Sequence, residues 1–508
     1  MIGLKSRAAG RGADSLLWVD DFWKQAGKYI FCREDDGVLI LPPNRVYKIN
    51  KTGAALIAFL KNGGKAKELA ASARIAESVG TTEQAEITKR ADPDAAGEKS
   101  RLALIGDFFR TLAGIYGGDL SSGSGAGSPD ILGNVKQVPF DVGYTRLPVL
   151  GEIAVTYRSN NRCVFCYAGC NADREKHNAG FAADTADTAN VADTANGAGG
   201  ADELSTADWK RIITIFRDEA KIPFFSFTGG EPLLRADLEK LVKHARDIGL
   251  AVNLVSNGTL AGRRRAASLY RAGLRTAQIS IEAPDAETHD ALAGRKGAFA
   301  ETVRGIAAMA AAGISVQTNT TITRKNISAA PEMPAFLASL RDRAGRRIIT
   351  RFAMNMYIPG TGPGPREDLF VGYDEIGPVV DEVRRRAFQA GLGFYWYSPT
   401  PFCYYNPIAR GMGNKNCAAA DGLVSVAADG GVLPCSSWNE PLGNILTENF
   451  GDIWFSGRAL FLKHKNAAPV SCRACSSFTA CQGACPLYWR ARGTELLEPE
   501  AACSGVKT

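Results

Sequence analysis

From Ile153 to Tyr357, short apolar runs alternate with longer segments whose apolar residues recur at helical spacing. Each run has the length of a buried strand, and each intervening segment has the length of a helix. This alternation predicts an α/β fold, a parallel sheet covered by helices that forms a partial (β/α)6 barrel. In such folds ligands gather at the carboxyl ends of the strands. The predicted strands are residues 153–157, 224–228, 251–256, 276–281, 315–321 and 348–357.

The N-terminal part of the chain has a different pattern. Alternating positions predict short strands at 29–32, 37–41 and 46–49, followed by helices at 51–60 and 65–73. A charged stretch of poor periodicity, 74–99, separates these from another predicted helix at 100–115. The predicted organisation is a tail (1–28), a small domain (29–116), a linker (117–145), the barrel (146–392) and a cysteine-rich domain (393–508).

Two segments of low complexity lie between these regions. Residues 117–129 are rich in glycine and serine, which is typical of a flexible linker. Residues 179–201 repeat Ala-Asp-Thr-Ala and are predicted not to fold. Because helical periodicity resumes directly after it, the second segment is interpreted as an insertion within the barrel.

Three cysteines lie on a polar loop directly after the first predicted barrel strand: Cys163, Cys166 and Cys170. Thiolates this close together can bind a metal ion or an iron–sulfur cluster. The stretch Ser159–Cys170 resembles the signature loop of the radical S-adenosylmethionine (SAM) enzymes, Cys-x3-Cys-x2-Cys with an aromatic residue before the last cysteine. In that family three cysteines bind three irons of a 4Fe–4S cluster, and the fourth iron binds the amino and carboxylate groups of SAM.

The loop departs from the family pattern at one position. Aligned on the aromatic residue Phe165, Cys163 and Cys166 match the second and third ligands, and Ser159 stands where the first cysteine is expected. Three alternatives follow: Ser159 is an oxygen ligand, Cys170 supplies the third thiolate, or the cluster site is incomplete. Iron–sulfur clusters favour soft thiolates over a hydroxyl that holds its proton near neutral pH, which favours Cys170.

A turn of sequence Gly229-Gly230-Glu231-Pro232 follows the second predicted strand. Glycines let a backbone run close to a ligand, and a carboxylate accepts hydrogen bonds from a cationic amino group. The turn resembles the family motif that holds the amino group of SAM. By the same resemblance, Ser280 and Asn319 are expected near the ribose and carboxylate of SAM, and Phe165 near its adenine.

The remaining cysteines return near the C-terminus. Their spacing resembles the seven-cysteine auxiliary-cluster (SPASM) domain found on radical SAM enzymes that modify peptides. The resemblance implies two auxiliary 4Fe–4S clusters. One would be bound by Cys472, Cys475, Cys481 and Cys503, and the other by Cys417, Cys435 and Cys485, with Cys403 as its fourth ligand. A zinc ribbon at Cys472-x2-Cys475 is the alternative. Cys32 is left over and is expected to pack as a small apolar residue.

Composition and charge narrow the classes of binding partner that we expect for this chain. The 508 residues are 45% hydrophobic and 22% charged, and the basic residues behind a net charge of +7 are scattered, so no nucleic acid is expected to bind. No apolar run approaches the roughly 18 residues that span a bilayer, and no secretory signal lies near Met1. We therefore expect a cytoplasmic protein with no membrane partner. Twelve cysteines without an export signal favour metal binding over disulfides.

Residues 29–73 resemble a peptide-recognition element, a small winged-helix domain similar to the pyrroloquinoline-quinone chaperone. Such domains bind a leader peptide as an extra strand at a sheet edge; a purely structural N-terminal cap is the alternative. The combined resemblance implies a radical SAM oxidoreductase that matures a ribosomally made peptide. A 5′-deoxyadenosyl radical would abstract hydrogen from the peptide to install a crosslink or another modification. A small electron donor such as flavodoxin or ferredoxin is the implied second partner.

Other functions remain open at the level of sequence. A sulfatase maturase uses the same three-cluster layout, but the residue after Cys435 is Ser436, where those enzymes have an aspartate. Modification of a tetrapyrrole is a further possibility, which the N-terminal element disfavours because a small substrate needs no leader-binding domain. The non-enzymatic alternative is a relative with an impaired cluster at Ser159 that binds peptides.

Overall fold

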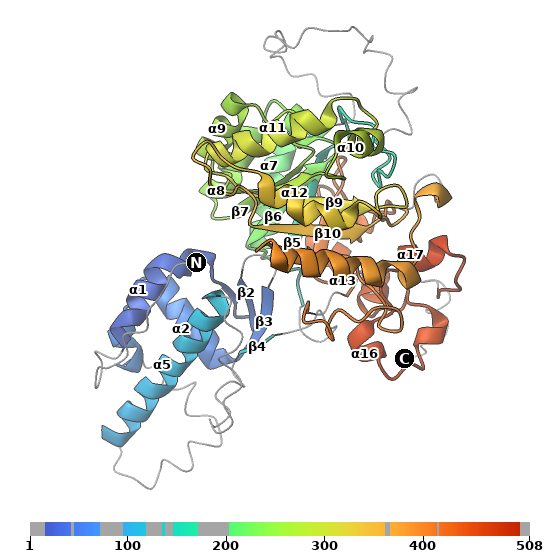
Figure 1. The fold of residues 1–508 in the computed structure, drawn as a ribbon. Coiled ribbons are helices and arrows are strands. Elements are labelled where there is room, and N and C mark those ends of the chain that lie inside the picture. The colour runs from blue at the N-terminus through green and yellow to red at the C-terminus, as the bar shows by residue number, and fades with distance from the viewer. Residues whose placement is uncertain are drawn as a thin grey trace. The chain divides into compact units, whose positions relative to one another are not determined.

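The structure is a computed structural model that describes residues 16–41, 45–71, 95–117, 135–137, 146–170, 203–360, 366–413 and 416–497. The chain divides into two compact units, Met1–Val149 and Leu150–Thr508, each with a sheet of its own (Figure 1). The predicted insertion at 179–201 lies outside the described residues. Within the described residues, no helix combines the length and the apolar character that crossing a bilayer requires.

The first unit is built on a four-stranded antiparallel sheet of order β1-β2-β3-β4. All four residues of β2 are buried, and Phe109 and Leu112 of the last helix complete an apolar core with it. Cys32 packs partly buried against this core. The elements are α1 (Leu17–Ala26), β1 (Phe31–Arg33), β2 (Val38–Leu41), β3 (Arg45–Ile49), α2 (Lys51–Lys61), the 3-10 helix η3 (Ala66–Ala71), α5 (Ala95–Gly117) and β4 (Val135–Gln137).

Two of these elements lie where the sequence predicts a tail and a linker. Helix α1 begins within the predicted tail, and its residues Val19 and Phe22 are fully buried in the core of the unit. Strand β4 lies within the predicted linker and pairs with β3, with Lys136 opposite Lys48. Three residues are too few to show an alternating pattern, so only pairing with a partner strand identifies β4.

The second unit contains a sheet of ten strands in the order β11-β10-β9-β8-β7-β6-β5-β12-β13-β14. Strands β5 to β10 are parallel neighbours in chain order, which confirms the α/β architecture and the six predicted strands. Their bounds are β5 (Leu150–Thr156), β6 (Phe224–Gly229), β7 (Ala251–Ser256), β8 (Thr276–Ser280), β9 (Ser315–Ile322) and β10 (Arg351–Met356).

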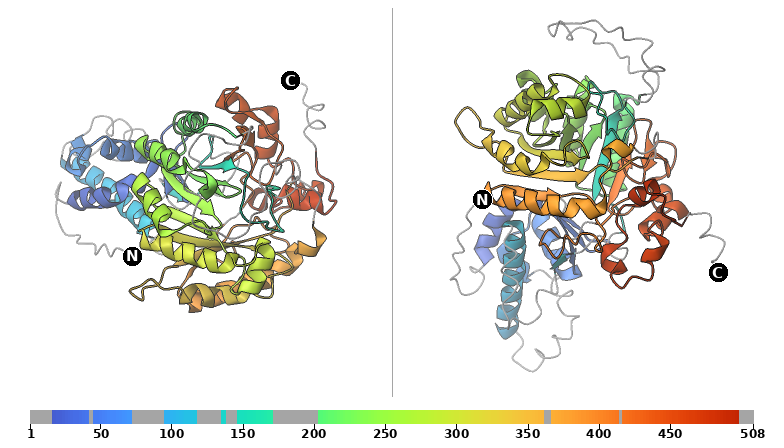
Figure 2. Two further views of the ribbon diagram at one scale, coloured as in Figure 1. Left: turned by 90° about the horizontal axis from the view of Figure 1, so that it is seen from above. Right: turned by 45° about the vertical axis from the view of Figure 1, so that its right-hand side comes forward.

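Helices cover one face of this sheet, and successive helices pack against one another (Figures 1 and 2). Helix α7 begins at a capping box made by Ser205 and Asp208, and its buried Phe216 meets Phe225 of β6 edge to face at 5.7 Å. A side chain at Gly151 would collide with Phe216, so this residue of β5 faces the helix layer. The helices are α7 (Thr206–Asp218), α8 (Leu238–Asp247), α9 (Arg263–Ala272), α10 (Ala286–Ala293), α11 (Ala298–Ala311), α12 (Met333–Ser339) and α13 (Tyr373–Gln389).

The sheet extends beyond the six predicted strands at both ends. Strand β11 (Gly393–Trp396) pairs in parallel with β10, and β12 (Leu423–Val426) pairs in parallel with β5. The antiparallel strands β13 (Gly431–Leu433) and β14 (Gly443–Asn444) follow β12. The cysteine-rich C-terminal region therefore shares the barrel sheet through β12. Its helices are α14 (Phe450–Trp454), α15 (Gly457–Lys463), α16 (Phe478–Cys481) and α17 (Pro486–Ala491).

The buried aromatic pair of the first unit gives a test of its core. Phe109 is fully buried and meets Phe108 edge to face at 5.1 Å. Phe109→Ala should lower the free energy of unfolding of this unit by about 3–5 kcal/mol, because it removes a buried ring and leaves a cavity. Faster amide hydrogen exchange in β2 would report the loss. Phe388→Ala, at a site 86% exposed, is the matched control and should change little. Equal effects of the two variants would contradict this core assignment.

Candidate functional site

The cysteine loop leaves the carboxyl end of β5 and is held against the end of α10. The backbone N–H of Arg162 donates to the carbonyl of Ala293 at 2.8 Å, and that of Val164 donates to Leu292 at 3.0 Å. Because backbone hydrogen bonds fix both ends of this segment, the loop has one defined path across the barrel.

Two asparagines in the loop add side-chain anchors. Asn160 donates to Thr259 Oγ1 at 2.8 Å and accepts from Asn257 at 2.9 Å, which ties the loop to the end of β7. Asn161 is buried and accepts from Arg295 at 2.7 Å. The two asparagines connect the cysteine loop to the segment after β7 and to the segment between α10 and α11. Cysteine spacing alone does not reveal these anchors.

The three thiols of the loop influence one another. A hydrogen bond between Cys166 and Cys170 lowers the pKa of Cys166 to about 6 and raises that of Cys170, because one proton is shared by two sulfurs. Burial, with a smaller contribution from Glu282, raises the pKa of Cys163 to about 12. A positive metal centre would relieve this mutual repulsion, since thiolates and not thiols are metal ligands.

Ser159 is already engaged within the loop. Its hydroxyl oxygen accepts the backbone N–H of Asn161 at 3.2 Å, which is a local turn contact. Gly169 adopts a φ of +62°, a left-handed conformation that brings Cys170 back toward Cys166. Both observations favour Cys170 over Ser159 as the third protein ligand of the cluster predicted on this loop, although the sequence pattern of the family places that ligand at position 159.

The glycine pair after β6 is required by contacts within the chain. Gly229 has a φ of +128°, and a Cβ there would lie 2.1 Å from the carbonyl oxygen of Thr156. A Cβ at Gly230 would lie 2.2 Å from the carbonyl oxygen of Arg158. The sequence suggested close approach to a ligand; the structure shows that these glycines first allow the turn to pack against the start of the cysteine loop.

Glu231 is fully buried and joins three neighbouring groups. One carboxylate oxygen accepts from Leu233 N at 3.0 Å and Ser256 Oγ at 2.8 Å, and the other accepts from Asn257 N at 2.8 Å. Burial raises the pKa of Glu231 to about 7 against these hydrogen bonds. The side chain of Glu231 therefore fixes the turn after β6 to the end of β7. The backbone of the same turn lies beside the cysteine loop.

The other predicted cofactor residues lie on the same sheet. Ser280 and Asn319 are direct neighbours on β8 and β9. Asn319 donates to Asn355 Oδ1 at 2.7 Å, and its own side-chain oxygen Oδ1 is buried with no hydrogen-bond partner among the described residues. A buried acceptor of this kind calls for a donor, which a bound polar ligand can supply. Phe165 lies half-buried on the cysteine loop between Cys163 and Cys166.

The C-terminal cysteines form two separate groups. Cys417, Cys435 and Cys485 make up the first: a hydrogen bond with Cys485 lowers the pKa of Cys417 to about 6, and burial raises that of Cys435 to about 12. Lys465 lies beside this group, donating at 2.8 Å both to the carbonyl of Cys417 and to buried Asp421. This buried ion pair fixes the segment before β12 that carries Cys417.

Cys403 lies beside the second group, Cys472, Cys475 and Cys481, whereas the predicted assignment made it a ligand of the first group. The backbone N–H of Phe402 donates to the sulfur of Cys481 at 3.3 Å, so the segment after β11 runs directly past that cysteine. Burial and then Cys481 raise the pKa of Cys403, and Cys403 in turn acts on Cys472. The resemblance to the SPASM domain implied the other group. Cys503 lies outside the described residues.

The eleven described cysteines form no disulfide. In the described part of the chain, no three His, Cys, Asp or Glu side chains converge tightly enough for one metal ion. An iron–sulfur cluster places each cysteine on a different iron, so its sulfurs stand farther apart than the ligands of a single zinc ion. Three thiols on one loop, two further thiol groups and the unpartnered oxygen of Asn319 fit iron–sulfur clusters and a polar cofactor.

Comparison with known proteins agrees with this arrangement. Residues 153–329 match the model of the radical SAM superfamily, and residues 417–476 match that of SPASM, an iron–sulfur cluster-binding domain. The chain contains a radical SAM domain and a SPASM domain. Domains of these two kinds use a 4Fe–4S cluster with SAM and auxiliary iron–sulfur clusters, respectively.

The chain is similar to several known proteins. It is 43% identical over 125 residues to the AdoMet-dependent heme synthase of Oleidesulfovibrio alaskensis, a match that covers 25% of the chain and 32% of that protein. It is 29% identical over 293 residues to the PqqA peptide cyclase of Xanthomonas euvesicatoria, covering 56% of the chain and 75% of the relative. The structure of Streptococcus suis SuiB superposes with a TM-score of 0.58 at 14% identity, over 90% of this chain and 94% of SuiB, which shows a shared fold.

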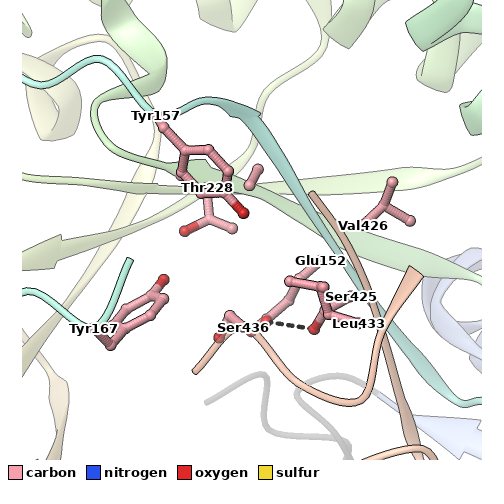
Figure 3. Close-up of a pocket in the computed structure, with 10 residues that line it drawn as sticks. Glu152, Tyr157, Tyr167, Thr228, Ser425, Val426, Leu433 and Ser436 are labelled. Carbon is pink, nitrogen blue, oxygen red and sulfur yellow. Dashed lines mark hydrogen bonds between the residues drawn. The ribbon is translucent and has the colours of Figure 1, made fainter. Parts of the chain in front are cut away.

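One cavity next to the cysteine loop was not anticipated from the sequence. It has about 10 Å³ of free space, room for about one water-sized group, and is lined by residues of β5, β6, the cysteine loop and the SPASM region (Figure 3). Glu152 lies in it, hydrogen-bonded to Ser425 Oγ at 3.2 Å, and burial raises the pKa of this glutamate against bonds from Ser425 and Ser436. An acidic residue in the middle of the apolar strand Leu150–Thr156 was the available signal, since unpaired charges are rare in buried strands.

The identity of the third SAM-cluster ligand can be tested by two matched variants. Cys170→Ala should abolish the visible absorption and electron paramagnetic resonance signal of the SAM cluster and the production of 5′-deoxyadenosine. Ser159→Ala should keep at least part of both, because it removes a local hydroxyl that accepts the backbone N–H of Asn161 and no thiolate. Full activity of Cys170→Ala would contradict the assignment, and a gain of activity in Ser159→Cys would point to Ser159 as the vacant ligand position.

The placement of Cys403 predicts a loss of iron. Three 4Fe–4S clusters correspond to about 12 irons per reconstituted chain, so Cys403→Ala should remove up to about a third of them. Cys472→Ala with Cys475→Ala should remove the same third. Cys32→Ala, on the core of the other unit, is the matched control and should leave the iron content unchanged. Unchanged iron in Cys403→Ala would return this cysteine to a non-ligand role.

Proposed function

We propose that this radical SAM–SPASM enzyme modifies a ribosomally made peptide by abstracting a hydrogen atom from it. When bound by the cysteine loop and the Gly229–Pro232 turn, the SAM cluster and SAM would supply the radical chemistry that this abstraction requires. The observation that carries the proposal is the double pairing of β5, with β6 on one side and β12 on the other. This pairing places the cysteine loop, the Gly229–Pro232 turn and the SPASM strands around one cavity.

The chain's own groups support a role in positioning. Asn160 and Asn161 hold the cysteine loop, and Glu231 holds the turn that packs against it. Fixed geometry of this kind favours a reaction in which a reactive species must meet one particular carbon. The buried surroundings of the loop would keep water from that species.

A peptide substrate is supported by the first unit and by two relatives. The unit has a small antiparallel sheet whose edge strands are β1 and β4, and an extended peptide can join such an edge by main-chain hydrogen bonds. The edge of β3 is already covered by β4, so a leader would pair with an outer strand or displace β4. The relative in Xanthomonas is named a PqqA peptide cyclase, and SuiB has been solved bound to the precursor peptide SuiA.

Tetrapyrrole modification is the second candidate. It is favoured by the 43% identity to an AdoMet-dependent heme synthase, although that match covers only 32% of the relative. Sulfatase maturation is disfavoured by Ser436, because a serine hydroxyl is a weak base where those enzymes have an aspartate. The N-terminal sheet gives a peptide substrate the stronger support of the two.

The proposal predicts 5′-deoxyadenosine formation coupled to a mass change in a peptide. The reconstituted enzyme should release 5′-deoxyadenosine from SAM with dithionite, or with flavodoxin or ferredoxin as the electron donor. Addition of the small precursor peptide encoded next to this gene should change the mass of that peptide by whole hydrogen atoms. A scrambled leader with the same core sequence is the control and should react at least about tenfold more slowly. Reaction with a tetrapyrrole and not with any peptide would overturn the proposal.

A further inference from the structure

We propose that the cavity around Glu152 binds a cationic side chain of the substrate, with Glu152 as its counter-ion. This inference rests on the proposed peptide substrate. It assigns one residue class to the part of the peptide that enters the barrel, which the domain matches leave open.

The cavity is built from parts of the chain that are far apart in sequence. Its polar lining consists of Glu152 on β5, Thr228 on β6, Tyr157 and Tyr167 of the cysteine loop region, and Ser425 and Ser436 of the SPASM region. Figure 3 shows Glu152, Ser425 and Ser436 grouped together, with Tyr157 and Tyr167 across the same space. Neighbouring groups on either side of β5 therefore converge on one carboxylate.

The orientation of Glu152 follows from strand geometry. Gly151 faces the helix layer, so its neighbour Glu152 projects to the opposite face, toward the inside of the barrel. Ser425 on β12 and Ser226 on β6 lie directly beside Glu152 in the strand registers. Asn253 of β7 donates to Ser226 at 3.2 Å, which continues the same polar row across the sheet. A polar row inside a barrel is suited to a bound group and not to a dry core.

Glu152 has hydroxyl partners but no cation. Among the described residues, no lysine or arginine forms an ion pair with it, and its hydrogen bonds come from Ser425 and Ser436. Asp421, a buried acid of the SPASM region, has Lys465 at 2.8 Å. Burial without a counter-charge raises the pKa of Glu152, and an entering cation would stabilise its ionised form through a charge-assisted hydrogen bond.

The size and the donors of the cavity select one side chain. The free space of the cavity is about 10 Å³, room for about one water-sized group, so it fits the ammonium head of a side chain and not a complete ligand. A lysine ammonium carries three donors, which match the carboxylate of Glu152 and the oxygens of Ser425 and Ser436. Gly229 on the cofactor side and Ser436, the neighbour of Cys435, both line the cavity, so that ammonium would lie between the two predicted cluster regions.

The test uses the full, anaerobically reconstituted chain and two small probes. Binding of N-acetyl-lysine amide and N-acetyl-norleucine amide is measured by calorimetry; the two have similar stems and differ in charge. The wild-type protein should prefer the lysine probe by about tenfold or more, as expected for a charge-assisted contact. Glu152→Gln, which keeps the shape and removes the charge, should abolish this preference. Glu375→Gln, the same change at an exposed ion pair with Arg324, is the matched control and should keep it.

Each outcome decides the proposal. Equal binding of the two probes to the wild-type protein would overturn it without any variant, even if Glu152→Gln fails to fold. An unchanged lysine preference in correctly folded Glu152→Gln would also overturn it, and Ser425→Ala with a reduced preference would support the same site. If Glu152→Gln loses SAM affinity and keeps the lysine preference, the cavity serves the cofactor and the proposal is wrong. Absence of 5′-deoxyadenosine would instead contradict the proposed function, because probe binding does not depend on SAM cleavage.

Discussion

The pairing of β5 on both edges is the constraint on which the rest of the second unit depends. Strand β6 on one side carries the Gly229–Pro232 turn, and β12 on the other side begins the region of the SPASM cysteines. The cysteine loop continues from β5 itself. A single strand therefore sets the relative positions of all three parts, and hydrogen bonds along both of its edges make that placement rigid.

Polar groups near the loop are satisfied mainly by the protein itself. Glu231 is enclosed by donors from the turn and from β7, and Asn160 and Asn161 bond to neighbouring connections. Such a network rigidifies a site before any ligand arrives. The exceptions stand out: Asn319 keeps a buried oxygen without a partner, and Glu152 has only hydroxyl partners. These two residues mark where bound groups would complete the structure.

The pKa values of the cysteines show a similar contrast between neighbouring groups. In both the loop and the first SPASM group, two sulfurs share a proton, so one thiol ionises easily and the next one resists. Buried thiols packed this closely repel one another once ionised. Binding to iron would replace the shared protons with positive charge, which is the physical reason to assign these groups to metal and not to an apolar core.

The sequence by itself determined the strand–helix order of the barrel, because short apolar runs and amphipathic segments reflect local burial. It also determined the cysteine loop and the Gly229–Pro232 turn, since these motifs are contiguous in the chain. Tertiary structure decided what depends on distant segments. Strand β4 is recognisable only by its pairing with β3, and Cys403 lies beside Cys481 because the segment after β11 passes that cysteine. Glu152 acquires its neighbours only when β12 pairs with β5, and strand register is a property of the folded sheet that no local pattern contains.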